Sequence, residues 1–144
     1  MNSIKIREAE RKDMDAVHKL IIELARFEES ESSVKTSPGI LQQDGFQESS
    51  KFKCWVAENK DEIVGMAFVY PRYSTWVGEV LHLEDLIVTE SNRGLGIGGL
   101  LLDEVVKYGH SIGVKRISWE VLDWNEEAIK FYEERGARVM RDWD

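Results

Sequence analysis

The sequence predicts one α/β domain over residues 1–144, with an α+β mixed sheet and helices on its faces. Stretches of alternating hydrophobicity and stretches of helical periodicity follow one another in the order β α α β β β α β α β. The central strands are joined by short turns, which favours antiparallel pairs, and the later strands alternate with helices, which favours a parallel pair. A chain of 144 residues has the usual size of one domain and can bury a core without disulfides or metals.

One strand and two helices are expected in the N-terminal part of the chain. Residues 3–9 alternate between apolar and polar side chains, as a half-buried strand does. Residues 12–27 show helical periodicity, because their apolar side chains fall on one stripe. After a polar stretch, Ser37 and Pro38 have the pattern of an N-cap and a first helical residue, which opens a short helix toward Asp44.

Three strands are expected in the middle of the chain. Residues 51–58 and 63–73 alternate and are separated by a short polar turn, so they predict a hairpin. Residues 79–88 form a long strand with Glu84 and Asp85 near its middle. Successive side chains alternate along a strand, so these two acids are expected on opposite faces.

The C-terminal part is expected to contain two helices and two strands. A glycine-rich loop leads into a helix over residues 96–112, and residues 115–123 form a strand. Asn125 has the pattern of an N-cap, and Gly136 that of a helix stop. A last strand begins in residues 137–141.

The composition excludes several classes of protein. The formal net charge of -8 argues against nucleic acid as the main partner, since phosphate binding needs a basic face. The single cysteine, Cys54, is expected to be a small core residue. No apolar run has the length of a signal peptide or a membrane span, so a cytoplasmic protein is expected. The three histidines lack metal-like spacing, and no metal is expected; His82 should share the strand face of Glu84.

The glycine-rich loop predicts an anion site. Gly94, Gly96 and Gly99 match the spacing G-x-G-x-x-G, and Arg93 stands directly before them. Loop amides and a helix N-terminus together suit a phosphate or pyrophosphate. A nicotinamide-binding turn is disfavoured, because five polar residues separate the preceding strand from Gly94 and little chain follows Gly99. A P-loop is excluded, since no Gly-Lys-Ser/Thr follows.

Two segments carry a resemblance to a known family. RGLGIG (93–98) resembles the acetyl-CoA signature Arg/Gln-x-x-Gly-x-Gly/Ala of the GCN5-related N-acetyltransferases (GNAT), and WNEEAIKFYEERGA (124–137) resembles the family's Asn…Ala…Phe-Tyr…Gly segment. Within that superfamily the sequence is most similar to the diamine (spermidine/spermine) acetyltransferases, and especially to their thialysine N-ε-acetyltransferase branch. The further segments that carry this are ELARFE (23–28), DGF (44–46), YSTW (73–76), LED (83–85) and LDWN (122–125).

The resemblance implies the GNAT fold and an acetyl-CoA-dependent N-acetyltransferase. Its substrate would be a primary amine on a small cation: a diamine, a polyamine or a thialysine-like molecule. The resemblance also implies a homodimer, and it places the family's final strand beyond Asp144, in a longer chain or in a partner. Two alternatives stay open: an acetyltransferase for protein lysines or N-termini, and a non-catalytic module that binds CoA or a dinucleotide. The acids around residues 83–85 favour small cations over the first alternative.

Site residues follow from the resemblance position by position. The pantetheine arm of acetyl-CoA would pair with the backbone of a strand and contact an asparagine; these positions are Leu86, Ile87, Val88 and Asn125. The pyrophosphate would lie on the loop and helix start formed by Arg93, Gly94, Leu95, Gly96, Ile97, Gly98 and Gly99. The amine pocket would be lined by Phe27, Glu28, Trp76, Asp85 and Ser118.

The catalytic pair implied by the resemblance is Glu84 and Tyr132. An amine with a pKa near 10.4 is neutral at pH 7 in on the order of one molecule in a thousand, a cost of roughly 4–5 kcal/mol. Glu84 corresponds to the family's carboxylate, which accepts the ammonium proton through water; burial would raise the pKa of such a group. Tyr132 corresponds to the general acid that protonates the leaving thiolate. A non-catalytic module needs neither residue.

Overall fold

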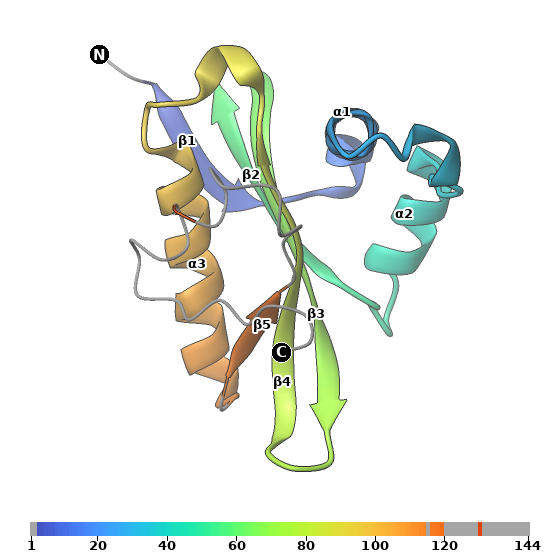
Figure 1. Cartoon of the computed structure of the whole chain (residues 1–144), viewed down its shortest axis with the longest axis vertical. Helices are drawn as coiled ribbons and strands as arrows, with labels where there is room; N and C mark the ends of the chain where they lie inside the picture. Colours follow the sequence, from blue (N-terminus) through green and yellow to red (C-terminus); the bar gives the residue numbers. More distant parts are fainter. Residues whose placement is uncertain (1–2, 115, 120–129, 131–144) are drawn as a thin grey trace.

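A five-stranded sheet with the order β1-β2-β3-β4-β5 forms the centre of the fold (Figure 1). The computed structural model describes residues 3–114, 116–119 and 130. From β1 to β4, each strand pairs antiparallel with the next one along the chain, and β5 lies parallel to β4. The predicted mixed sheet is therefore confirmed. The strands are β1 (Ile4–Glu8), β2 (Lys53–Asn59), β3 (Glu62–Ser74), β4 (Gly78–Val88) and β5 (Ile117–Trp119).

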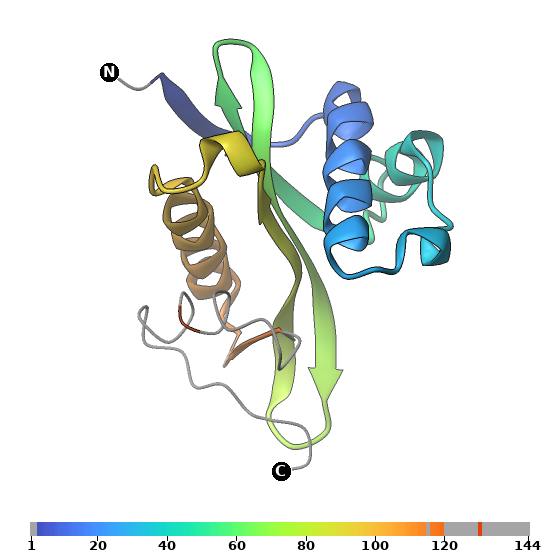
Figure 2. The same ribbon diagram turned by 45° about the horizontal axis from the view of Figure 1, so that its top comes forward.

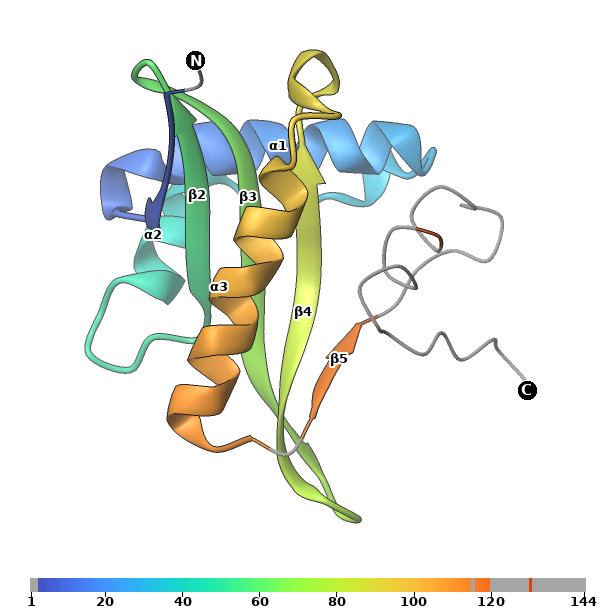
Figure 3. The ribbon, with the colours of Figure 1, turned by 90° about the vertical axis from the view of Figure 1, so that its left-hand side faces the viewer.

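Helices cover both faces of this sheet. The helices α1 (Met14–Phe27) and α2 (Pro38–Gly45) lie together on one face, and α3 (Ile97–Ile112) lies on the other (Figures 2 and 3). Short 3-10 turns precede α1, follow α1 and follow β4 at Arg11–Asp13, Glu31–Ser33 and Glu90–Asn92. None of the helices in the described ranges is long and apolar enough to cross a membrane.

The alternation of the strands divides the core into two layers. Met66 and Ile87 point toward α1 and pack with its Met14 and Val17. The side chains that point the other way, such as Leu81, pack against α3. Cys54 is buried in the α1 layer, which confirms its predicted place in the core.

Local signals in the sequence agree with the element boundaries. Ser37 Oγ accepts a hydrogen bond of 3.2 Å from the Ile40 N–H, so it caps α2 as predicted. The turn between β2 and β3 places Lys60 and Asp61 at positive φ, the backbone geometry that a tight hairpin requires. The predicted strand over 115–123 is described only in part. The helix and strand predicted after it lie outside the described residues, except for Lys130, which is helical.

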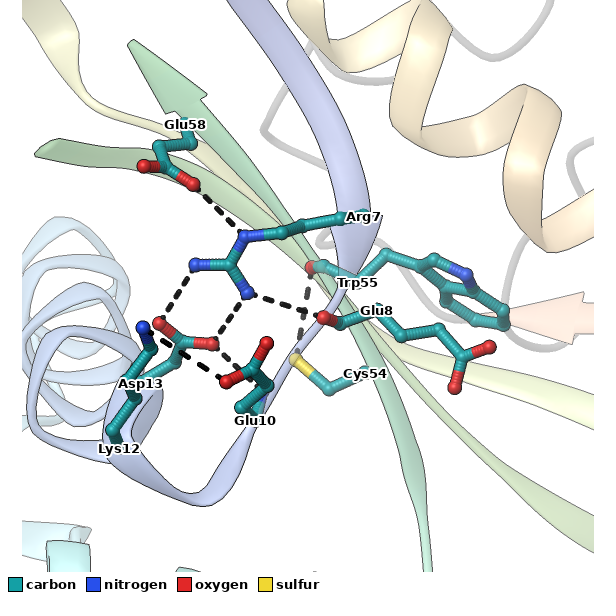
Figure 4. Close-up of polar contacts among 8 residues, drawn as sticks. All are labelled: Arg7, Glu8, Glu10, Lys12, Asp13, Cys54, Trp55 and Glu58. Carbon is teal, nitrogen blue, oxygen red and sulfur yellow. Dashed lines mark hydrogen bonds and ion pairs between the residues drawn. The ribbon is translucent and has the colours of Figure 1, made fainter. Parts of the chain in front are cut away.

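A charged cluster joins β1, β2 and the start of α1 (Figure 4). Arg7 donates two hydrogen bonds to the Asp13 carboxylate, at 2.7 and 3.0 Å, and one of 2.9 Å to Glu58 Oε1. The backbone N–H of Glu10 donates a further bond of 2.7 Å to Asp13. Burial opposes ionisation of Asp13, but these bonds outweigh it and lower the pKa of its carboxyl. The cluster therefore holds the chain where β1 turns into α1.

Candidate active site

A β-bulge interrupts β4 at Glu84. Leu83 pairs with Val69 on β3 and Asp85 pairs with Phe68, so Glu84 is an extra residue without a counterpart on β3. A bulge of this kind bends a strand and changes the direction of its side chains. The bulge therefore lies at the pair of acids, Glu84 and Asp85, that the sequence places in the middle of this strand.

The bulge changes the face on which Asp85 lies. Asp85 is paired with Phe68, which packs in the α1 layer, and paired residues share a face of the sheet. His82 belongs to the same face through its partner Tyr70, and its Nε2 lies 3.7 Å from Glu84 Oε1. The prediction that Asp85 points away from Glu84 is therefore wrong, because simple alternation does not hold across the extra residue. Both acids gather on the α1 side.

The end of α1 brings a third acid to this place. Glu28 follows the last residue of α1, and Glu29 then takes a left-handed conformation with φ of 58°. This allows Ser30 to donate a backbone hydrogen bond of 2.8 Å to the carbonyl of Ala25, a common way of ending a helix. Burial raises the pKa of Glu28. The helix end therefore presents a partly desolvated carboxyl near β4.

The charges of Glu84 and Glu28 act on Asp85. Burial first, and then the negative charges of Glu84 and Glu28, raise the pKa of Asp85 to about 7. Glu84 is the more open of the neighbouring acids, with 52% of its side chain exposed. Of the two acids in the middle of β4, the more buried one is therefore Asp85. A cluster of acids that repel one another favours binding of a cation, which relieves the repulsion.

The raised pKa of Asp85 leads to a prediction about stability. The folded state binds this proton more tightly than the unfolded chain, so the cost of ionising Asp85 grows as pH rises from about 4 to about 7. Asp85→Asn should therefore increase the free energy of unfolding at pH 8, by an amount of the order of a few kcal/mol, and so raise the melting temperature. At pH 4 it should have little effect. The same change at exposed Asp103 serves as the control. Equal effects of Asp85→Asn at both pH values would contradict the account.

Ser118 and Arg72 contact His82 rather than the acids. His82 is 4% exposed, and its Nδ1 lies 2.8 Å from Ser118 Oγ and 3.0 Å from Arg72 Nη1. Ser118 pairs with His82 across the parallel ladder of β4 and β5. Arg72 was not expected at the site. The sequence could have indicated it, because Arg72 lies two residues from Tyr70 on the same predicted strand and therefore on the same face.

Within the described residues, β5 runs along only the first part of β4. In the described part of the chain, β5 pairs with β4 only from Leu81 to Leu83. Leu86, Ile87 and Val88 continue the strand beyond that point; Ile87 is buried in the α1 layer, and Leu86 and Val88 are partly buried in the α3 layer. Their backbone groups on this edge are suited to pairing with an extended ligand.

The glycine loop follows this edge directly. Arg93 Nε donates a hydrogen bond of 2.9 Å to the carbonyl of Val88, and Arg93 Nη2 lies 3.8 Å from Glu23 on α1. Gly94 and Gly96 have positive φ of 84° and 82°, and open space surrounds the place where a Cβ would be. Such conformations favour glycine and leave the backbone accessible. Leu95, between them, is exposed.

The start of α3 points its free amides into the same region. Gly96 precedes the first residue of the helix, and Leu100 makes the first helical hydrogen bond, to the Gly96 carbonyl. The N–H groups of Ile97, Gly98 and Gly99 have no acceptor within the helix. With the helix dipole they form a site for an anionic group. These features fit the diphosphate of a nucleotide-like ligand.

Two further residues that were expected to line the amine pocket are exposed to solvent. Trp76 lies at the tip of the β3–β4 hairpin with 94% of its surface exposed, and Phe27 is 49% exposed at the end of α1. Asn125 and Tyr132 lie outside the described residues. No group of three or more possible metal ligands occurs in the ranges that the structure describes.

Comparison with known proteins identifies the family. The model of the Acetyltransferase (GNAT) family matches residues 14–137. The thialysine N-ε-acetyltransferase of Mus musculus is 37% identical over 99% of this chain and 88% of its own length. The spermidine/spermine N(1)-acetyltransferase-like protein 1 of Homo sapiens is 34% identical over 95% of this chain and 21% of its own length.

Solved structures agree on the fold. The structure of an aminoglycoside acetyltransferase from an uncultured soil metagenomic sample superimposes with a TM-score of 0.78 over 98% of this chain and 95% of its own, at 19% identity. An integron cassette protein from the mobile metagenome of V. cholerae gives a TM-score of 0.77 at 26% identity, over 99% of this chain and 90% of its own. The family model and the relatives in sequence lead to one conclusion: the chain belongs to the GNAT family of acetyltransferases and is an acetyl-CoA-dependent N-acetyltransferase.

Proposed function

We propose that this enzyme acetylates a primary amine of a small cationic molecule, of the diamine, polyamine or thialysine type. The observation that carries the proposal is the position of Glu28 and Glu84 around Asp85 at the bulge in β4, where burial and the charges of these two neighbours raise the pKa of Asp85 and a bound cation would offset that repulsion. Thialysine and spermidine/spermine in the names of the relatives support this class of substrate. The first alternative, a protein substrate, has no comparable support.

The proposed place of acetyl-CoA follows the order of elements along the chain. The backbone of Leu86, Ile87 and Val88 would hold the pantetheine arm, and the amides from Gly94 to Gly99, with Arg93 beside them, would hold the pyrophosphate. Glu84 lies about 13 Å from Val88 along the extended strand. The acids and the anion site are therefore separated by a length of β4 backbone along which a long ligand could lie.

In the proposed mechanism the acids and Tyr132 handle protons and charge. Acetyl-CoA supplies the acetyl group as a thioester. Asp85 and Glu28 would attract the cation, and Glu84, which is open to solvent, would accept the ammonium proton through water. The neutral amine then forms a C–N bond to the acetyl carbon while the C–S bond breaks. Tyr132 would donate its phenol proton to the sulfur, and the proton that the newly acylated nitrogen loses would restore the phenol, directly or through water.

A pair of substrates of equal length tests the cation site. We expect kcat/KM for 1,5-diaminopentane to exceed that for 1-aminopentane by roughly tenfold or more, because only the diamine carries a second charge for the acidic cluster. Glu28→Gln should reduce this preference by raising KM for the diamine. Glu29→Gln removes the same charge one residue further along, on an exposed side chain, and should leave the preference unchanged. Equal kcat/KM for the two amines would contradict a cation-binding cluster.

We also propose that the enzyme is a homodimer. Tyr73 and Trp76 expose 76% and 94% of their surfaces at the β3–β4 hairpin, and a second copy of the chain could cover them. Sedimentation velocity at micromolar concentration tests this assembly, which a monomer at every concentration would contradict.

A further inference from the structure

His82 is held from both neighbouring strands. Tyr70 is its partner on β3, with the two rings 5.2 Å apart, and Ser118 is its partner on β5. Arg72 reaches back along β3, so that its Nη1 lies 3.0 Å from His82 Nδ1. On the other side of the ring, Nε2 lies 3.7 Å from Glu84 Oε1. A buried ring with such partners on three strands has a defined orientation.

The contacts of the ring indicate where its proton lies. A guanidinium is a donor only, so the nitrogen that faces Arg72 must offer its lone pair. Ser118 Oγ, at 2.8 Å, can donate to the same nitrogen. The neutral imidazole therefore carries its hydrogen on Nε2, the nitrogen directed at Glu84. A second proton on Nδ1 would place an N–H against a cation.

We infer that His82 is a positioning residue for Glu84: Arg72 and Ser118 hold it as the Nε2–H tautomer, and that N–H directs the Glu84 carboxylate toward the amine. The inference deepens the proposed function and rests on Glu84 as the acceptor of the amine proton. The separation of 3.7 Å is longer than a direct hydrogen bond, so in the free enzyme the interaction is a charge–dipole contact or passes through one water.

The same arrangement determines where the proton goes next. Nε2 already bears a hydrogen and Nδ1 faces Arg72, so His82 does not take the proton from Glu84. Glu84 instead releases it to solvent, to which about half of its side chain is open. His82 therefore orients the proton acceptor without being a member of a proton relay, and its loss should lower kcat more than it raises KM.

The tautomer can be observed without any assay of activity. Long-range ¹H–¹⁵N NMR of the protein labelled in histidine distinguishes Nε2–H from Nδ1–H imidazoles, and the spectrum of His82→Phe assigns the His82 signals against those of His18 and His110. We expect the Nε2–H pattern at neutral pH, and a mixture of tautomers in Arg72→Met. A predominant Nδ1–H tautomer, or a doubly protonated ring, in the unsubstituted protein would overturn the inference.

Kinetics then test the connection to Glu84. His82→Phe should lower kcat roughly tenfold, a size typical of directly coupled residues, with little change in the KM for acetyl-CoA. His82→Gln, whose amide N–H can replace Nε2–H, should recover most of this loss. In a Glu84→Gln background His82→Phe should have almost no further effect.

The possible failures can be told apart. If His82→Phe lowers kcat by the same factor in both backgrounds, His82 acts independently of Glu84 and the inference is overturned. If Glu84→Gln alone leaves kcat unchanged, the proposed role of Glu84 is overturned. Should His82→Phe fail to fold, Arg72→Met replaces it in the same cycle, because Arg72 is exposed and its loss leaves the imidazole in place.

Discussion

Replacing Tyr132 by phenylalanine is expected to lower kcat by roughly 10²-fold or more, the usual contribution of a general acid or base. A thiolate is a poor leaving group unless it receives a proton, and a phenol with a pKa near 10 is protonated at neutral pH and matched to a thiol. Removing the hydroxyl takes away the proton but keeps the ring. Binding of acetyl-CoA, measured by calorimetry, should therefore stay within about twofold of the unsubstituted enzyme.

A second tyrosine provides the matched control for this experiment. Tyr108 on α3 packs its ring against Trp55 at 5.3 Å and lies under the Lys53 ammonium at 5.1 Å. Tyr108→Phe keeps this packing and should leave kcat unchanged. If Tyr132→Phe weakens acetyl-CoA binding as much as it lowers turnover, Tyr132 is a binding or packing residue and not the acid.

Replacing Asp13 by alanine is expected to lower the free energy of unfolding by about 3–5 kcal/mol, the cost of removing one partner of a buried ion pair. The Asp13 side chain is 6% exposed, and Arg7 would be left with Glu58 alone. A backbone N–H of the turn before α1, that of Glu10, also loses its acceptor. Urea denaturation measures the change; it is large against a typical total of about 5–15 kcal/mol.

The pH dependence of this effect has a definite sign. The pKa of Asp13 is lowered by folding, so its contribution is complete above the ordinary pKa near 3.8 and is lost as pH falls below that value. The difference between Asp13→Ala and the unsubstituted protein should therefore shrink at acid pH. Asp103→Ala, on the exposed face of α3, should change stability by less than about 0.5 kcal/mol. A similar loss in both variants would contradict the role of the cluster.

Most of the fold can be predicted from the sequence because its signals are local. Alternation predicts β1 to β4, helical periodicity predicts α1 and α3, and Ser37 with Pro38 predicts the start of α2. The glycine loop was predicted for the same reason, since Gly94 and Gly96 occupy positions that require positive φ. Each of these features depends on neighbours in the chain and not on distant contacts.

The arrangement of the acids could not be predicted in the same way. The bulge at Glu84 depends on the register between β3 and β4, and no glycine or proline in 83–85 marks it. Strict alternation therefore separated two carboxyls that the fold brings to one face. The buried contacts of His82 depend likewise on which strands become neighbours, since Arg72 and Ser118 lie 10 and 36 residues away in sequence.

One measurement tests the central claim most directly: release of CoA from acetyl-CoA, followed by thiol titration, with a panel of amines. The panel contains thialysine, spermidine, putrescine, lysine and a lysine-bearing peptide. The account predicts clear turnover with thialysine or a diamine and none with the peptide. Turnover of the peptide alone, or acetyl-CoA binding without turnover of any small amine, would contradict it.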